Sequence, residues 1–166
     1  MKVKYQYRNI DINGDFKCIH CRHHISSDSA LSGVVNRNHC PYCLYSRHLD
    51  LYKAGDRLSA CKGQMKPVGL TLKKTNKKYG SEKQGELMLI HLCTECDKVS
   101  INRIAADDIA DTLYEIYTGS QHLKTAIRAR LQTFDVTVLT PKDDWLVRAR
   151  LFGCSEGITS FEALFA

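Results

Sequence analysis

The pattern of hydrophobic and polar positions divides the chain into two unlike parts. Between residues 16 and 104, short stretches of strand length alternate with cysteine pairs. Beyond residue 104, hydrophobic residues recur at the three- and four-residue spacing that is typical of helices. The pattern therefore predicts an α+β fold, in which a small β domain is followed by a short helical segment.

Two hydrophobic stretches of the first part predict a β-hairpin. Residues 65–72 read MKPVGLTL and residues 86–93 read ELMLIHLC. The polar segment between them contains Tyr79 as its one hydrophobic residue, so it can contribute little to a core. We therefore expect a hairpin with a long basic tip. The lysines of this tip are Lys73, Lys74, Lys77, Lys78 and Lys83.

Three segments of the second part predict helices. Residues 106–119 carry a helical pattern that ends at a glycine, and the acidic pair Asp107 and Asp108 is interpreted as part of its first turn. Residues 120–134 place three hydrophobic residues on one face. Residues 140–153 begin with a threonine N-cap and a proline and end at a glycine. In this last helix we expect Trp145 to anchor the core.

The overall composition is that of one ordinary globular domain. The chain has 166 residues, of which 43% are hydrophobic and 25% are charged. No apolar run approaches the roughly 18 residues that a membrane span needs, and residues 1–16 lack the apolar stretch of a signal peptide. We therefore expect a cytoplasmic protein with no membrane partner.

Positive charge is concentrated in the part that contains the cysteines. Residues 1–107 carry 18 Lys and Arg against 10 Asp and Glu, whereas residues 108–166 carry 6 against 8. A basic surface on a small metal-binding module suggests a polyanionic partner such as RNA or DNA. The alternative is that the basic balance mainly supports solubility.

The first group of cysteines has the spacing of a four-cysteine zinc site. Its members are Cys18, Cys21, Cys40 and Cys43. Each CxxC pair presents two thiolates to one ion, and two pairs complete the tetrahedron that zinc prefers. His20 and His39 flank these pairs as competing ligands, but the cysteines already satisfy the count. Because four protein ligands leave no position for water, the predicted site is structural.

A second group contains three cysteines and lacks a fourth ligand. Its cysteines are Cys61, Cys93 and Cys96. The candidates for the fourth position are His48 and His91, and we favour His48. His91 shares a strand face with Cys93 at a spacing of about 6–7 Å, which strains joint binding to one ion, whereas Asp50 is available to orient His48. If neither histidine binds, the site keeps the open position that a catalytic zinc needs.

The residues around both groups resemble the RNHCP domain family. The similar segments include FKCIHC at residue 16, RNHCPYCLYSRHLD at residue 37, LIHLCTEC at residue 89 and INRIAADD at residue 101. The resemblance implies a zinc-ribbon-like domain over residues 16–108 and no established activity, and the two ligand groups predict two zinc ions per chain. Residues 1–15 are expected to form a strand or arm, and residues 109–166 a helical C-terminal extension.

Three functions are compatible with these features. The first is a non-enzymatic zinc-binding protein that docks on structured RNA, such as the ribosome or an assembly intermediate, through Arg37, Arg47 and the lysines of the hairpin tip. The second is an adaptor that binds another protein through its C-terminal helices. The third, a metal-dependent nuclease or hydrolase, requires an incompletely ligated zinc. We expect no enzyme.

Overall fold

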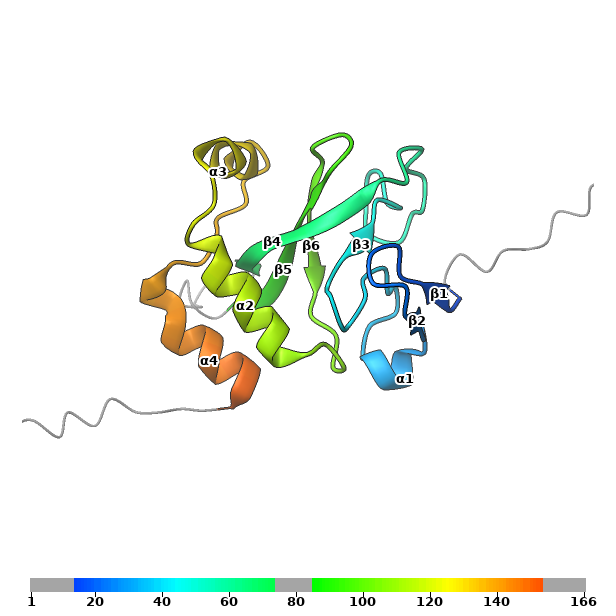
Figure 1. The fold of residues 1–166 in the computed structure, drawn as a ribbon, viewed down its shortest axis with the longest axis horizontal. Helices are drawn as coiled ribbons and strands as arrows, with labels where there is room; N and C mark the ends of the chain where they lie inside the picture. Colours follow the sequence, from blue (N-terminus) through cyan, green and yellow to red (C-terminus); the bar gives the residue numbers. More distant parts are fainter. Residues whose placement is uncertain (1–13, 74–84, 154–166) are drawn as a thin grey trace, which may run out of the picture.

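The centre of the molecule is a four-stranded antiparallel sheet. The computed structural model describes residues 14–73 and 85–153, and Figure 1 shows its elements. The strand order is β3-β4-β5-β6. The strands are β3 (Ser46–Arg47), β4 (Gln64–Lys73), β5 (Glu86–Cys93) and β6 (Val99–Arg103). The predicted hairpin is therefore confirmed as β4 and β5, whereas the segment 74–84 of its tip lies outside the described residues.

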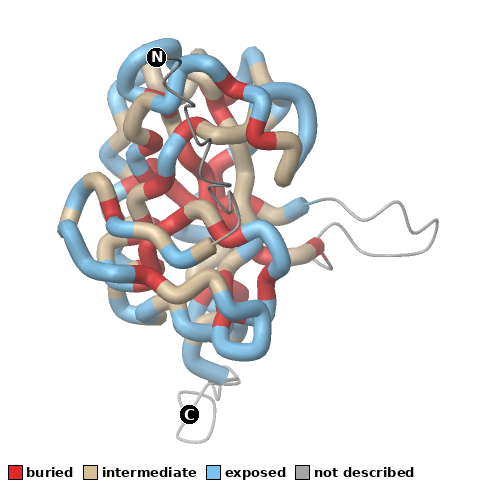
Figure 2. The backbone as a smooth tube through the Cα atoms, turned by 90° about the vertical axis from the view of Figure 1, so that its right-hand side faces the viewer, coloured by how far each residue is buried: buried red, intermediate tan, exposed pale blue. Residues whose placement is uncertain are grey.

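Alternate residues of β5 belong to two different hydrophobic cores. Leu87 and Leu89 pack in one core with Leu113 and Tyr117, whereas Ile90 packs in the other. This division follows from the two-residue period of a strand, which sends successive side chains to opposite faces. The uninterrupted hydrophobic run of β5 is thus explained, because both faces of the strand are covered. In Figure 2 the buried residues, drawn in red, gather mainly in the middle of the molecule.

The C-terminal helices pack on this sheet. They are α2 (Ala110–Ser120), α3 (Thr125–Gln132) and α4 (Asp144–Phe152), and a short 3₁₀ turn η2 (Pro141–Asp143) leads into α4. Figure 1 shows α2 and α4 on the same side of the molecule, away from β1 and β2. The expected helix start is confirmed, because Thr140 and Asp143 form a capping box, and Gly153 ends α4 with a φ of 69°.

One expectation about α4 is wrong. Trp145 was expected to anchor the core, but 55% of it is exposed, and the neighbouring residues Leu146 and Val147 are buried instead. The reason is helical phase, since two adjacent inward positions turn the preceding residue toward solvent.

The boundary predicted at residue 109 does not separate two cores. Leu44, Leu70 and Leu89 precede it, and they share one core with Tyr117 and Val147, which follow it. Close contact is also built into β4 at Gly69, where a Cβ atom would lie 3.1 Å from the side chains of Ser120 and Val138. The helical extension and the sheet therefore form one packed unit.

The first cysteine pair lies in a small appendage at the other end of the sheet. It contains β1 (Phe16–Lys17), β2 (His24–Ile25) and the short helix α1 (Ser29–Ser32). Strands β1 and β2 form a separate two-stranded sheet. Their core is small and consists of Ile25 with cysteines of the first group. The appendage therefore depends on those cysteines for its stability.

Candidate metal centres

The four cysteines of the first group converge as predicted. Their sulfur atoms all lie within 4.8 Å of one another. The Sγ atoms of Cys18 and Cys43 are 3.6 Å apart, and those of Cys21 and Cys40 are 3.5 Å apart. A tetrahedral ion with metal–sulfur bonds of about 2.3 Å places its sulfurs about 3.8 Å apart. The geometry therefore fits an ion of the size of zinc. We call this set of four cysteines cluster 1.

The second group forms a similar cluster with His48, as favoured above. Its four ligand atoms also lie within 4.8 Å of one another. The Sγ atoms of Cys61 and Cys93 are 3.7 Å apart, and Nδ1 of His48 lies 3.3 Å from Sγ of Cys96. The hairpin brings Cys93 close to Gln64 and Met65 at the start of β4, which directly follow the Cys61 segment. We call this set of three cysteines and one histidine cluster 2.

The cysteines of both clusters sit in a repeated backbone turn. The residue that follows the last cysteine of each metal-binding segment has a positive φ between 51° and 67°. These residues are Arg22, Leu44, Lys62 and Asp97. In the three CxxC segments, the N–H of the first cysteine also donates to the carbonyl five residues later. The left-handed residue reverses the chain, so that both sulfurs of a pair point to the same place.

The thiols of cluster 1 differ in how easily they ionise. Burial raises the pKa of Cys40 to about 11 and raises that of Cys43 as well. Burial acts in the same sense on Cys18, but hydrogen bonds from the backbone N–H groups of Cys21 and His20 outweigh it and lower the pKa. A buried cation is therefore needed before all four sulfurs can be thiolates.

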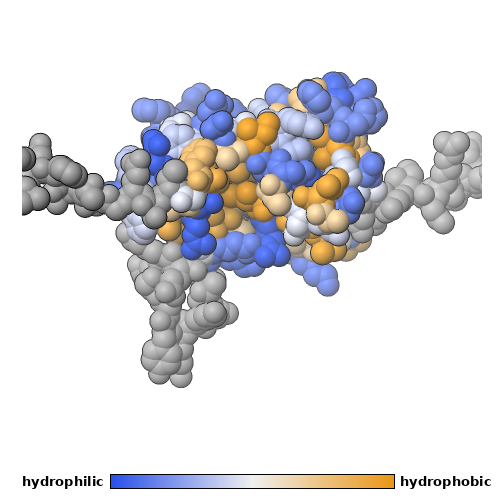
Figure 3. All heavy atoms as spheres, turned by 90° about the horizontal axis from the view of Figure 1, so that it is seen from below, coloured by the Kyte–Doolittle hydropathy of each residue, from blue (hydrophilic) through white to orange (hydrophobic). Residues whose placement is uncertain are grey.

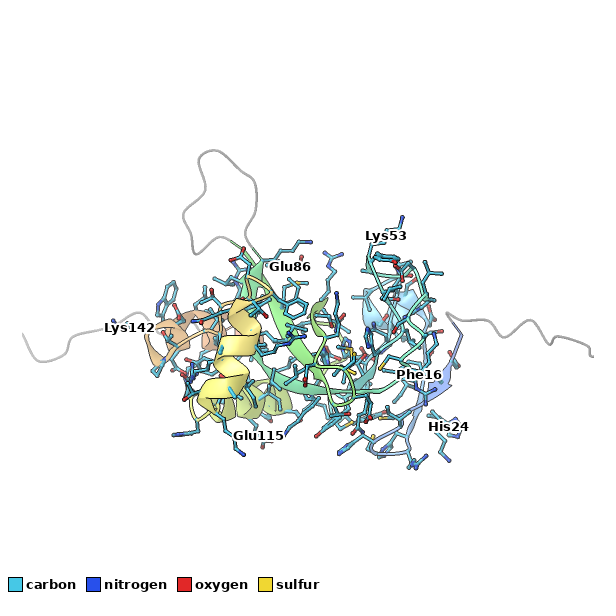
Figure 4. The ribbon with its side chains drawn as sticks, turned by 90° about the horizontal axis from the view of Figure 1, so that it is seen from above. Phe16, His24, Lys53, Glu86, Glu115 and Lys142 are labelled. Carbon is cyan, nitrogen blue, oxygen red and sulfur yellow. The ribbon has the colours of Figure 1, made fainter. Side chains whose placement is uncertain are left out.

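Cluster 2 shows the same contrast between its sulfurs. The backbone N–H of Gly63 lowers the pKa of Cys61, whereas burial raises that of Cys96 to about 11. Cys61 and Cys96 are exposed, while Cys93 and His48 are buried. Cluster 2 thus lies half at the surface, and cluster 1 lies deeper. Figure 4 shows the sulfur atoms gathered on the side of the molecule that carries Phe16.

His91 is excluded as the fourth ligand by its own hydrogen bonds. Its Nε2 donates to the carbonyl of Leu44 at 2.7 Å, and its Nδ1 accepts from the side-chain amide of Asn102 at 2.7 Å. The ring is fully buried, and burial lowers its pKa to about 3. Both nitrogens are therefore engaged in the core, and the ring is neutral.

The other polar residues near the clusters have several roles. Burial lowers the pKa of His48, and a backbone hydrogen bond with Asp50 opposes this shift, so Asp50 meets the ring through its backbone while its carboxylate accepts from the backbone N–H groups of Gly55 and Arg57. His20 stacks on Tyr45 with a centroid distance of 3.8 Å and does not compete for cluster 1. The sequence reasoning did not assign His23 to this cluster, yet its Nδ1 lies 3.3 Å from Sγ of Cys21. The position of His23, two residues after the second cysteine of a CxxC pair, is the feature of the sequence that could have indicated this contact.

Two residues of the RNHCP stretch, Arg37 and His39, belong to a largely buried ionic network. Arg37 donates to Asp107 at 2.6 Å, and Nε2 of His39 lies 2.8 Å from the carboxylate of Asp108. Asp108 also accepts from the backbone N–H of Ala105. The interpretation of the two aspartates as helix first-turn residues is therefore wrong, since α2 begins only at Ala110. The network instead joins the second CxxC pair of cluster 1, Cys40 and Cys43, to the segment that precedes α2.

This network also removes Arg37 from the predicted RNA contacts. Only 1% of its side chain is exposed, and its guanidinium is engaged by Asp107, Asp108 and the carbonyl of His39. Such a group cannot reach a phosphate at the surface. Arg47 on β3 and Lys73 at the end of β4 are exposed, as the prediction requires. The remaining tip lysines lie outside the described residues: Lys74, Lys77, Lys78 and Lys83.

Each cluster supplies the number and kind of ligands that a structural zinc site uses. Cluster 1 offers four sulfurs, and cluster 2 offers three sulfurs and one imidazole nitrogen. Sets of this composition with four protein ligands are closed, because no position remains for water or substrate. Such an ion would hold the surrounding loops in one conformation and so contribute to folding.

Comparison with known proteins supports a metal-binding domain. The family model of the RNHCP domain matches residues 13–114. No curated protein and no solved structure matches the chain. The matched region includes all ligands of clusters 1 and 2 and the whole sheet, and it ends within α2. The chain belongs to the RNHCP domain family.

Proposed function

We propose that each cluster holds one zinc ion and that the protein is a non-enzymatic module that binds structured RNA, with ribosomal RNA or an assembly intermediate as the expected target. The observation that carries this proposal is the distribution of charge around the clusters. Cationic side chains are exposed there. They are Lys17, Arg47, Lys53 and Lys62.

Three carboxylates of the same region are already engaged within the protein. Asp15 accepts from the N–H and hydroxyl of Ser27. Asp56 accepts from several backbone N–H groups of its own loop, and Asp108 is enclosed by Arg37 and His39. These hydrogen bonds hold three carboxylates within the protein, while Glu95 and Asp97 beside Cys96 stay exposed. A surface with exposed cations attracts phosphates and gives salt-dependent affinity.

The complete ligand sets favour a binding protein over a hydrolase. Metal-assisted hydrolysis needs an open position on the ion and a base beside it. Clusters 1 and 2 each present four ligands. His39, a candidate base, is 2% exposed and is bonded to Asp108. No helix within the described residues has the length and apolar character to cross a bilayer, and a cytoplasmic location is part of the proposal.

The proposal is tested by the salt dependence of RNA affinity. A variant with glutamine at Lys73, Lys74, Lys77, Lys78 and Lys83 should bind a structured RNA more weakly and show a flatter slope of affinity against salt. Its zinc content and melting temperature should equal those of the wild type. Equal affinity and equal slope would remove the tip lysines from the interface. If wild-type protein does not bind RNA at low salt, the proposal fails.

A second candidate is an adaptor that binds another protein through its C-terminal helices. Trp145 and Phe152 are separated by two helical turns of α4, and both are exposed to a considerable degree. Hydrophobic patches bordered by hydrophilic residues also occur on the face shown in Figure 3. Exposed aromatic residues are enriched at protein interfaces. Protein partners that remain bound at high salt, and are lost in Trp145→Ala, would favour this function.

A further inference from the structure

A cavity of about 490 Å³ lies beside cluster 1. Its lining comes from residues 14–19, which include β1, from residues on both sides of the second CxxC pair, and from β3. Its volume falls within the range of small-molecule sites, about 300–1,000 Å³. Its lining includes Phe16, Lys17, Tyr45, Arg47, Leu49 and Lys62.

The wall of this cavity is strongly cationic. Lys17, Arg47 and Lys62 line it with exposed side chains, and the buried residues Arg37 and Arg57 also belong to its lining. The carboxylates that pair with the two buried arginines do not line the cavity. Among the described residues, Asp15 is the one acidic group in the lining, and two hydrogen bonds from Ser27 occupy its Oδ1. The cavity therefore favours an anionic ligand.

The remaining lining suits the flat, largely apolar part of a ligand. Phe16, Tyr45 and Leu49 contribute to the wall, and Tyr45 is held in place by its parallel stack on His20, with an interplanar angle of 1°. Aromatic side chains bind nucleobases by stacking or edge contact. An inorganic phosphate would leave most of this volume and all of its apolar wall unused. The combination of cationic and apolar groups therefore fits a nucleoside phosphate.

A second cavity adjoins the first. It has a volume of about 200 Å³ and shares Asn38, Arg47 and Leu49 with the larger one. Lys53, Lys98 and the exposed residue Tyr52 also line it, together with Asp50, whose carboxylate accepts from the backbone N–H groups of Gly55 and Arg57. Arg47 thus stands between two neighbouring depressions, where its guanidinium can bind a phosphate that links two nucleotides.

We propose that the larger cavity binds one nucleotide of an RNA strand, with its phosphate on Lys17, Arg47 and Lys62 and its base against Tyr45 and Leu49. The neighbouring cavity receives the next unit of the strand. The choice of a strand as the source of the nucleotide rests on the proposed RNA binding. The assignment of a nucleoside phosphate to the cavity rests on its lining alone.

The test uses the full-length protein and two charge-matched variants. The cavity variant carries Lys17→Gln, Arg47→Gln and Lys62→Gln. The control variant carries Lys124→Gln, Lys142→Gln and Arg150→Gln, which removes the same number of charges from the helical side. Figure 4 places Lys142 at the end of the molecule opposite to Phe16. Zinc content and melting temperature confirm that both variants fold.

The probes are adenosine 5′-monophosphate, adenosine, inorganic phosphate and a short single-stranded RNA. Backbone NMR signals of Tyr45 and Leu49 should move on addition of the nucleotide, and RNA should compete with it. The cavity variant should bind nucleotide and RNA at least about tenfold more weakly, because three phosphate contacts are lost. The control variant should bind both as the wild type does.

The other outcomes separate this inference from the proposed function. Equal shifts with inorganic phosphate and with nucleotide would overturn the nucleoside assignment. RNA affinity that is unchanged in the cavity variant, with no nucleotide response, would overturn the cavity site and leave RNA binding to other residues. Binding of nucleotide without competition from RNA would support the cavity as a nucleotide site and would count against the RNA proposal. No binding of either would reject both.

Discussion

His48 and His91 are both buried, but the contacts of their ring nitrogens give them different roles. His48 points Nδ1 at the sulfur of Cys96, whereas both nitrogens of His91 are bonded to Leu44 and Asn102. A histidine that serves a metal must leave one nitrogen lone pair available. Only His48 meets this condition among the two candidates, so the task of a histidine near cysteines is decided by its other hydrogen bonds.

Substitution of the two histidines should separate these tasks. His48→Ala should lose the ion of cluster 2 and leave one zinc per chain, because an incomplete set of ligands binds metal more weakly. His48→Cys should restore two, since four thiolates also suit zinc. His91→Gln should keep two ions and lower the melting temperature. Metal analysis of the purified variants is the measurement, and loss of one zinc in His91→Gln alone would contradict the assignment.

Arg37 and Arg47 should behave in opposite ways when each is replaced by glutamine. Arg37→Gln removes one partner from the buried carboxylate of Asp108, which keeps His39 and the N–H of Ala105, so we expect a loss of about 1–3 kcal/mol of unfolding free energy. Arg47 is exposed, so its replacement should change stability by about 0.5 kcal/mol or less while weakening RNA binding. Urea unfolding and RNA titration measure the two effects. Full stability with loss of RNA binding in Arg37→Gln would show that its guanidinium faces the ligand.

Asp56 should stay ionised at an acidity at which an ordinary aspartate is partly protonated. Its carboxylate accepts from the N–H groups of Lys53, Leu51, Leu58 and Tyr52, which hold its pKa well below the usual value of 3.8. Because the pKa is lowered in the folded state, the stabilisation is fully present above about pH 4 and is lost as the pH falls through the lowered pKa.

The carboxyl ¹³C shift of Asp56, followed from pH 6 to pH 4, should therefore remain constant. In Asp56→Ala, the amides of Leu51 and Tyr52 should exchange with solvent faster at neutral pH. Glu115→Ala is a control, because Glu115 is exposed on α2 and Figure 4 places it away from Lys53 of this loop. A titration of Asp56 near pH 4 would mean that its loop does not hold the carboxylate.

At the scale of elements, the parts that local patterns determine were predicted and the others were not. The β4–β5 hairpin and helix α4 follow from strand periodicity and from capping residues close together in the sequence. The short strand β6 and helix α1 were not predicted, because five and four residues carry too little periodicity. The burial of α2 on the sheet depends on tertiary contacts that no local pattern contains.

Helix α2 offers a test of this packing at Tyr117. Its ring is 2% exposed, and its hydroxyl donates to the carbonyl of Thr140 at 2.8 Å. Tyr117→Ala should lower the unfolding free energy by about 3–5 kcal/mol, as large aromatic truncations in cores do, and Tyr117→Phe by about 1 kcal/mol through the lost hydrogen bond. Tyr52→Ala is the control, because Tyr52 is 84% exposed.

Denaturant unfolding measures these differences. A cost of Tyr117→Ala no larger than that of Tyr52→Ala would mean that the helices do not depend on the sheet. The same experiment would then favour the adaptor, since an independent helical segment leaves its apolar face for another protein.

At the scale of the whole molecule, the metal ligands were more predictable than their support. CxxC spacing identifies six of the eight ligands, because each pair is a local turn, and the single cysteine Cys61 before the hairpin makes a seventh. The eighth, His48, could only be favoured over His91, since the choice depends on how the core uses each ring. Arg37 and Asp107 are 70 positions apart. Their pairing was missed because complementary charges at such a distance have no characteristic spacing.

We propose that two closed zinc sites hold the cysteine half of this RNHCP protein on its sheet. Native mass spectrometry of protein purified without added metal tests this proposal, because the mass counts the bound ions and identifies the element. We expect two zinc ions per chain, both of which are released when the protein is unfolded in acid. A protein that is folded with one ion, with none, or with another metal in either cluster would contradict it.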